Sequence, residues 1–143
     1  MRTIELPELP EIGVEVINME LLRLASMFDK KDIIVSLDEI MINDWQISPF
    51  SSDGCSCWPD SFLKRKGFSL EQVSIYPACF WHDVRYWLGK LGDDLAKLYA
   101  DTELMKDVAA AHSIGLGKLM FEGVQAGGIE GLKLPFSWGF GWK

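Results

Sequence analysis

Residues 76–92 read YPACFWHDVRYWLGKLG, and this stretch decides the fold. Pro77 lies where a proline fits the first turn of a helix, and Gly92 lies where a glycine ends one. We therefore expect a helix over residues 76–91 and a second helix over residues 93–111. Because the turn between them is very short, the two helices must run antiparallel. The sequence predicts a mainly helical protein with this helix pair at its centre.

His82 and Asp83 are the residues of the first helix that can carry chemistry. The chain has two histidines, His82 and His112, and these are its only side chains that titrate near neutral pH without help. On a helix His82 shares a face with Tyr86, whereas Asp83 points about 100° away. Taken alone, the His-Asp dipeptide predicts no more than one histidine and one acid on a helix surface.

Asp101 on the second helix suggests a stronger interpretation of His82. Leu98, Met105 and Val108 form an apolar stripe at helical spacing, and Asp101 occupies the stripe position between Leu98 and Met105. A carboxylate within a buried stripe is costly unless it is hydrogen-bonded or paired. The antiparallel turn brings it within reach of His82. A histidine oriented by a buried carboxylate is the base of many hydrolytic sites, although a purely structural His–Asp pair remains an alternative.

The N-terminal fifty residues give a weaker pattern. Asn18 is a reasonable N-cap for one short helix, whose apolar face consists of Leu21, Leu22, Leu24, Ala25 and Phe28. Residues 33–35 and 40–42 are apolar and fit either short strands or buried loop. Residues 48–67 are rich in Ser, Pro, Gly, Asp and Lys, which indicates a loop. We expect an irregular N-terminal region with at most short strands.

Length and composition define the class of protein. The chain of 143 residues is expected to form a single domain, with an N-terminal extension (1–50), a core (51–111) and a C-terminal part (112–143). Its net charge of −7 argues against nucleic-acid binding through phosphates. Its opening residues lack the apolar core of a signal peptide, so a cytoplasmic or virion-associated location is expected rather than classical secretion.

The C-terminal part is expected to hold a third helix and an aromatic tail. The third helix is predicted over residues 116–126 and ends at a pair of glycines. Residues 134–142 are rich in aromatic residues and glycine. We expect them to form an irregular segment packed on the core or on a partner.

The loop at residues 53–60, DGCSCWPD, could bind a metal ion. It can present a carboxylate and backbone carbonyls to a hard cation, which is the preference of calcium. The free carboxylate of Asp83 makes this interpretation more specific. A zinc site formed by Cys55, Cys57, Cys79 and His82 is an alternative, but Cys-x-Cys is not the usual spacing of structural zinc sites.

Together these motifs resemble the secreted-type phospholipase A2 superfamily, most closely its short prokaryotic and fungal branch. The resemblance rests on Ser51-Ser52-Asp53-Gly54-Cys55-Ser56, on Pro59-Asp60, on Tyr76-Pro77-Ala78-Cys79-Phe80-Trp81-His82-Asp83-Val84-Arg85-Tyr86, and on Asp101 in the second helix. It covers roughly residues 51–111. It implies a phospholipase A2-like core of two antiparallel helices plus additional helices.

The resemblance also implies roles for individual residues. His82 would activate a water molecule, Asp101 would orient His82, and Tyr86 would support Asp101. Asp53, the carbonyl of Gly54 and Asp83 would bind Ca2+, which polarises the ester carbonyl. Cys55 and Cys79 match the first disulfide of the family. The implied activity is calcium-dependent hydrolysis of an acyl ester in phospholipids at a membrane surface.

The chain also departs from the family pattern. Lys64-Arg65-Lys66-Gly67 is an insertion, Cys57 is an extra cysteine, and the later disulfide has no counterpart. The tail and the small size look more like phospholipase-like proteins of phages and mobile elements. An alternative function is therefore a virion or other assembly protein that keeps the fold with an inactive site. Its aromatic tail would then mediate oligomerisation or assembly.

Overall fold

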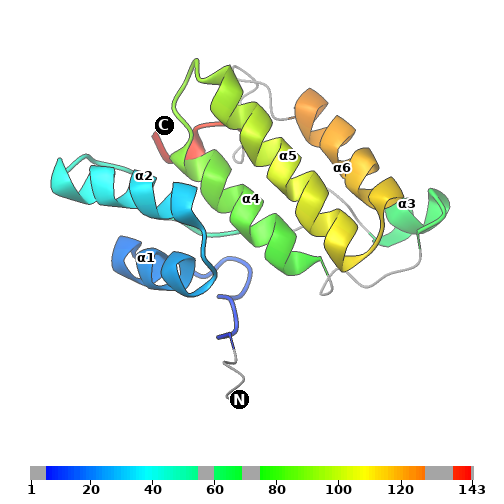
Figure 1. Cartoon of the computed structure of the whole chain (residues 1–143), viewed down its shortest axis with the longest axis horizontal. Helices are drawn as coiled ribbons and strands as arrows, with labels where there is room; N and C mark the ends of the chain where they lie inside the picture. The colour runs from blue at the N-terminus through cyan, green and yellow to red at the C-terminus, as the bar shows by residue number, and fades with distance from the viewer. Residues whose placement is uncertain (1–5, 55–59, 69–74, 128–136, 143) are drawn as a thin grey trace.

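The computed structural model describes residues 6–54, 60–68, 75–127 and 137–142, and this part of the chain is mainly helical (Figure 1). None of the described helices is long and apolar enough to cross a membrane. Within the described ranges, β-pairing is limited to one antiparallel bridge between Val16 and Phe50. The elements are α1 (Asn18–Met27), α2 (Lys31–Ile42), α3 (Asp60–Arg65), α4 (Tyr76–Leu88), α5 (Asp94–Ala111), α6 (Ile114–Gly127) and the 3₁₀-helix η2 (Phe140–Trp142).

The antiparallel helix pair is confirmed as the centre of the fold. Helices α4 and α5 lie side by side, and α6 packs along the other side of α5 (Figure 1). Helix α4 ends at Leu88, three residues earlier than expected. A Cβ atom at Gly89 would lie 2.5 Å from the ring of Trp138, so only glycine fits where the tail crosses the end of the helix. The turn is completed at Gly92, which has a φ of +86°.

Helix α4 is buried on every side. All residues from Ala78 to Leu88 are buried, because α1 and α2 cover one face of the helix and α5 covers another. This includes His82 and Asp83, although they point in different directions. The interpretation of the dipeptide as a surface histidine beside a surface acid is therefore wrong.

The N-terminal region is more regular than expected. Residues 33–35 and 40–42 are neither strands nor loop, because both segments belong to helix α2. The buried residues of α2 are Ile33, Leu37 and Ile40, which share one helix face at spacings of four and three. The β-branched residues made this stretch look like a strand, but packing against α4 overrides that local preference.

Two other segments also differ from the expectation. Helix α3 lies within the stretch that was expected to be loop, and helix α6 begins two residues before the expected start. The described tail residues, 137–142, pack on the core as expected. The indole of Trp138 donates to the carbonyl of Lys90 at 2.9 Å, and that of Trp142 donates to the carbonyl of Leu88 at 3.0 Å. Residues 134–136 lie outside the described ranges.

Candidate active site

Helices α4 and α5 bring His82 and Asp101 into direct contact. The distance from His82 Nε2 to Asp101 Oδ1 is 2.8 Å. Asp101 is completely buried, and His82 is 7% exposed. The expected juxtaposition of these two side chains is confirmed, whereas a catalytic role for them stays a prediction.

The apolar stripe around Asp101 differs from the one expected. The sequence analysis expected a buried stripe with Asp101 between Leu98 and Met105, but Leu98 is 44% exposed. Val108 is buried as expected, but the other buried apolar residues of α5 are Ala100 and Leu104, so that the three follow one another at intervals of four. Asp101 lies at the edge of this stripe, where α5 meets α4 and α6. Its burial follows from this helix packing more than from the residues three and four positions away.

Asp101 accepts hydrogen bonds from four side chains. Tyr86 donates its hydroxyl to Oδ1 at 2.6 Å, on the same oxygen that contacts His82. Lys97 donates to Oδ2 at 3.0 Å, and Gln125 of α6 donates to the same oxygen. The contact of Tyr86 agrees with its expected supporting position. Sequence reasoning missed Lys97, although it lies four residues before Asp101 on one helix face, and it had no local signal for Gln125.

These contacts set the protonation of the pair. Burial raises the pKa of Asp101, but the hydrogen bonds from His82 and Tyr86 outweigh it and hold that pKa below its usual value. Burial lowers the pKa of His82 below its usual value, against the opposing effect of Asp101, and the charges of Arg85 and Lys97 lower it further. His82 is therefore a neutral imidazole at neutral pH. When its Nε2–H donates to Asp101, the lone pair lies on Nδ1.

Asp83 lies in a second polar cluster, against the loop that precedes α3. Ser52 donates its hydroxyl to Asp83 Oδ2 at 2.6 Å, and the backbone N–H of Gly54 donates to the Ser52 hydroxyl oxygen at 2.9 Å. Burial raises the pKa of Asp83 well above its ordinary value, and the nearby charge of Asp53 raises it further. The hydrogen bond from Ser52 offsets only part of this shift. The half-buried carboxylate of Asp53 thus disfavours the ionised form of the buried Asp83.

The N-terminal segment holds this acidic loop in place. The backbone N–H of Gly13 donates to the carbonyl of Ser52 at 2.9 Å, and Val16 donates to Phe50 at 2.8 Å. Gly54 has a φ of +64°, and a Cβ atom there would lie 2.9 Å from the side chain of Ile12. No local pattern predicts this contact, because it joins residues about forty positions apart.

The chemistry of these donors fits a hard cation. Asp53 and Asp83 carry carboxylate oxygens, which are among the ligands that Ca2+ prefers. In the ranges that the structure describes, no group of three or more His, Cys, Asp or Glu side chains could hold a metal ion. A cation at this loop would therefore need backbone carbonyls and water to complete its shell.

The cysteines bear on the zinc alternative. Cys79 is disulfide-bonded, and a disulfide sulfur is not the thiolate that zinc binds. This removes one of the four ligands suggested for zinc. Cys55 and Cys57 lie outside the described residues, so the pairing of Cys79 with Cys55 stays a prediction.

Comparison with protein-family models, with curated proteins and with solved structures found no match for this chain. The interpretation of the site therefore rests on its geometry and on the motifs quoted above.

Proposed function

We propose that the protein hydrolyses the acyl ester of phospholipids in a calcium-dependent reaction of the phospholipase A2 type. The observation that carries this proposal is the buried contact between His82 and Asp101, one residue away from an acidic cluster around Asp83. A base and a cation site on adjacent residues of one helix would act on the same substrate carbonyl.

His82 is the base in this proposal. Nδ1 of the neutral imidazole takes a proton from a water molecule as that water attacks the ester carbonyl. Asp101 stabilises the imidazolium that forms, and later His82 returns the proton to the leaving alcohol. Tyr86, together with Lys97 and Gln125, fixes the orientation of Asp101. No covalent enzyme intermediate forms.

Asp53, the carbonyl of Gly54 and Asp83 hold the calcium ion in this proposal. When bound, the ion polarises the ester carbonyl and stabilises the oxyanion. The buried Asp83 side chain supports this role, because a nearby cation would favour its ionised form.

Hydrolysis of a mixed-chain phosphatidylcholine, followed by identification of the released fatty acid, tests this function. We expect release from one chain position in millimolar Ca2+ and none with a chelator. His82→Ala should abolish hydrolysis and leave calcium binding nearly intact, whereas Asp83→Asn should abolish both. The absence of both calcium binding and hydrolysis in the wild-type protein would overturn the proposal.

The burial of His82 favours a second candidate, an assembly protein that keeps the network only for structure. His82 is 7% exposed, and Trp138 of the tail contacts the ring of Tyr86 with 5.2 Å between centroids. In that case the wild-type protein neither binds calcium nor cleaves lipid. Instead, removal of residues 136–142 disrupts oligomerisation, which sedimentation velocity would report.

A further inference from the structure

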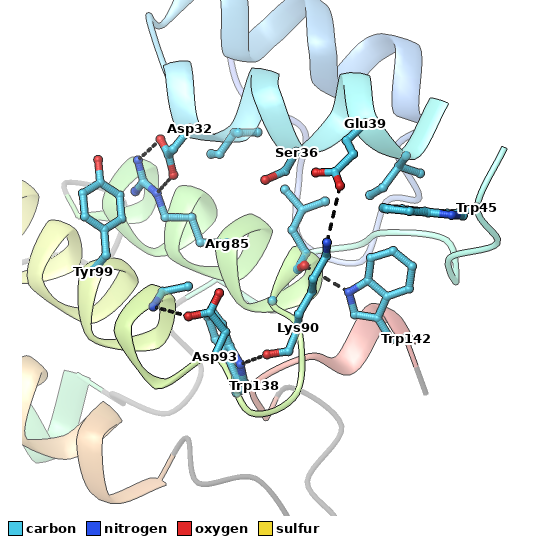
Figure 2. Close-up of a pocket in the computed structure, with 15 residues that line it drawn as sticks. Asp32, Ser36, Glu39, Trp45, Arg85, Lys90, Asp93, Tyr99, Trp138 and Trp142 are labelled. Carbon is cyan, nitrogen blue, oxygen red and sulfur yellow. Dashed lines mark hydrogen bonds and ion pairs between the residues drawn. The ribbon is translucent and has the colours of Figure 1, made fainter. Parts of the chain in front are cut away.

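A cavity of about 490 Å³ lies on the side of α4 that faces α2 (Figure 2). It is bounded by α2, the end of α4, the start of α5 and the tail. Its walls include four aromatic side chains, those of Trp45, Tyr99, Trp138 and Trp142. His82 is not among the lining residues, so this cavity is separate from the site discussed above. Its volume is within the range of small-molecule sites.

The charged residues of the cavity leave one acid without an ion pair in the described part of the chain. Arg85 makes two hydrogen bonds to Asp32, at 2.8 and 3.2 Å, and Lys90 pairs with Glu39 at 3.6 Å (Figure 2). Asp93 accepts a hydrogen bond from the backbone N–H of Ala96 and makes no ion pair within the described ranges. Three acids and two bases therefore give the lining a net charge of −1.

Both internal cations of the cavity already lie against aromatic rings. The ammonium of Lys90 is 4.9 Å from the centroid of the Trp45 ring, and the guanidinium of Arg85 is 5.7 Å from that of Tyr99. Each cation thus has an aromatic face and a carboxylate, which is the arrangement that binds organic cations in proteins. The Lys90 side chain is 58% exposed, so a ligand can displace its ammonium from the Trp45 ring without unfolding the protein.

We propose that this cavity binds an organic monocation of the quaternary ammonium class. A quaternary ammonium group has no N–H donor to satisfy, and aromatic rings with one surplus carboxylate complement its diffuse positive charge. The ammonium group stacks on Trp45 and Trp142, whose rings meet edge to face at 6.4 Å, and the net negative charge of the lining favours its binding. Free choline and the headgroup of phosphatidylcholine both carry this group.

Titration with choline chloride, followed by the indole N–H resonances of ¹⁵N-labelled protein, tests the proposal. The matched neutral probe is 3,3-dimethylbutan-1-ol, which has the same shape as choline but no charge, and sodium chloride controls for ionic strength. We expect choline to shift the Trp45 and Trp142 resonances with an affinity about tenfold higher than that of the neutral probe. Equal binding of the two probes, or no binding of choline at about 50 mM, would overturn the proposal.

Two charge variants give opposite expected effects. Asp93→Asn keeps a residue that can cap α5 but removes the surplus charge, so choline affinity should fall severalfold. Lys90→Gln removes the internal cation that occupies Trp45, so affinity should rise severalfold. The exposed variants Asp94→Asn and Lys106→Gln are the matched controls and should change nothing. An unchanged affinity in Asp93→Asn, or weaker binding in Lys90→Gln, would contradict the proposed arrangement.

A short-chain phosphatidylcholine below its micellar concentration distinguishes the source of the ammonium group. Tighter binding of this lipid than of choline would assign the cavity to a lipid headgroup, whereas tighter binding of choline would assign it to the free cation. Either result is independent of hydrolysis, because His82→Ala should bind both probes as the wild type does. Loss of choline binding in His82→Ala would contradict a separate site.

Discussion

Asp101 and Asp83 are buried carboxyl groups on neighbouring helices, yet their pKa values shift in opposite directions. Asp101 receives hydrogen bonds from four side chains, including the cation of Lys97, and its pKa lies below the usual value. Asp83 receives a hydroxyl bond from Ser52 and lies near a second acid, Asp53, and its pKa lies well above the usual value. The environment, rather than burial itself, decides the charge of each group.

The two carboxyl groups differ in how many side-chain donors the protein provides for their ionised form: Asp101 has four, whereas Asp83 has the hydroxyl of Ser52. The chain itself supplies everything that the ionised form of Asp101 needs. Asp83 lies near the charge of Asp53 and makes no ion pair in the described part of the structure, so an added cation would stabilise its ionised form. We therefore interpret Asp101 as a fixed structural partner of His82 and Asp83 as the group that responds to calcium and pH.

The largest expected effect comes from Asp101→Ala. The substitution leaves the buried donors of His82, Tyr86 and Lys97 without their acceptor, and we expect a loss of about 3–5 kcal/mol in the free energy of unfolding. Urea denaturation measures this loss. Thr102→Ala, on the exposed side of the same helix, is the control and should change stability by less than about 0.5 kcal/mol. A loss below about 1 kcal/mol in Asp101→Ala would show that the network contributes little.

Gly54→Ala tests the loop that places Asp53 beside Asp83. We expect a loss of about 2 kcal/mol, because the positive φ is strained for alanine and the new Cβ meets Ile12. Gly13→Ala is the matched control, since Gly13 also has a positive φ but nothing lies within 4 Å of its Cβ position. Thermal unfolding should show the larger loss in Gly54→Ala. Equal losses would mean that the contact with Ile12 does not constrain the loop.

Asp83→Asn tests the polar cluster around Asp83 in calcium-free protein. Because the folded pKa of Asp83 lies above its unfolded value of about 3.9, stability should fall as the pH rises through the folded pKa. The amide cannot ionise, so the variant should be about 1–2 kcal/mol more stable than wild type at pH 7 and no more stable below about pH 4. Asp38→Asn, at an exposed position of α2, is the control. A less stable Asp83→Asn protein at pH 7 would contradict the account.

Lys97→Gln should have the smallest effect. It removes one charged hydrogen bond to Asp101 but leaves three donors, so we expect a loss of about 1 kcal/mol in unfolding free energy. Lys106→Gln is the control, because Lys106 pairs with Glu103 on the exposed side of the helix. If both variants unfold alike in urea, Lys97 does not contribute to holding Asp101.

The sequence predicted the helix pair and the dyad because both depend on short-range signals. A proline, a glycine and a short turn define α4 and α5, and the antiparallel turn brings Asp101 to His82, although the apolar stripe assumed around Asp101 was partly wrong because Leu98 is exposed. The β-branched residues 33–35 are typical of a strand, so the helix α2 was not predicted. The buried face of α2 is decided by its packing against α4. Gln125 and the segment around Gly13 act across long sequence distances, where no local pattern exists.

Calorimetric titration with Ca2+ tests the central claim, that Asp83 is the carboxyl group that binds a cation. We predict that wild-type protein binds one ion and releases protons, seen as a buffer-dependent heat, and that proton release declines as the pH rises above the folded pKa of Asp83. Asp83→Asn should bind no calcium, and His82→Ala should bind it as the wild type does. Wild-type protein that binds no calcium, or Asp83→Asn protein that binds it equally well, would contradict the account.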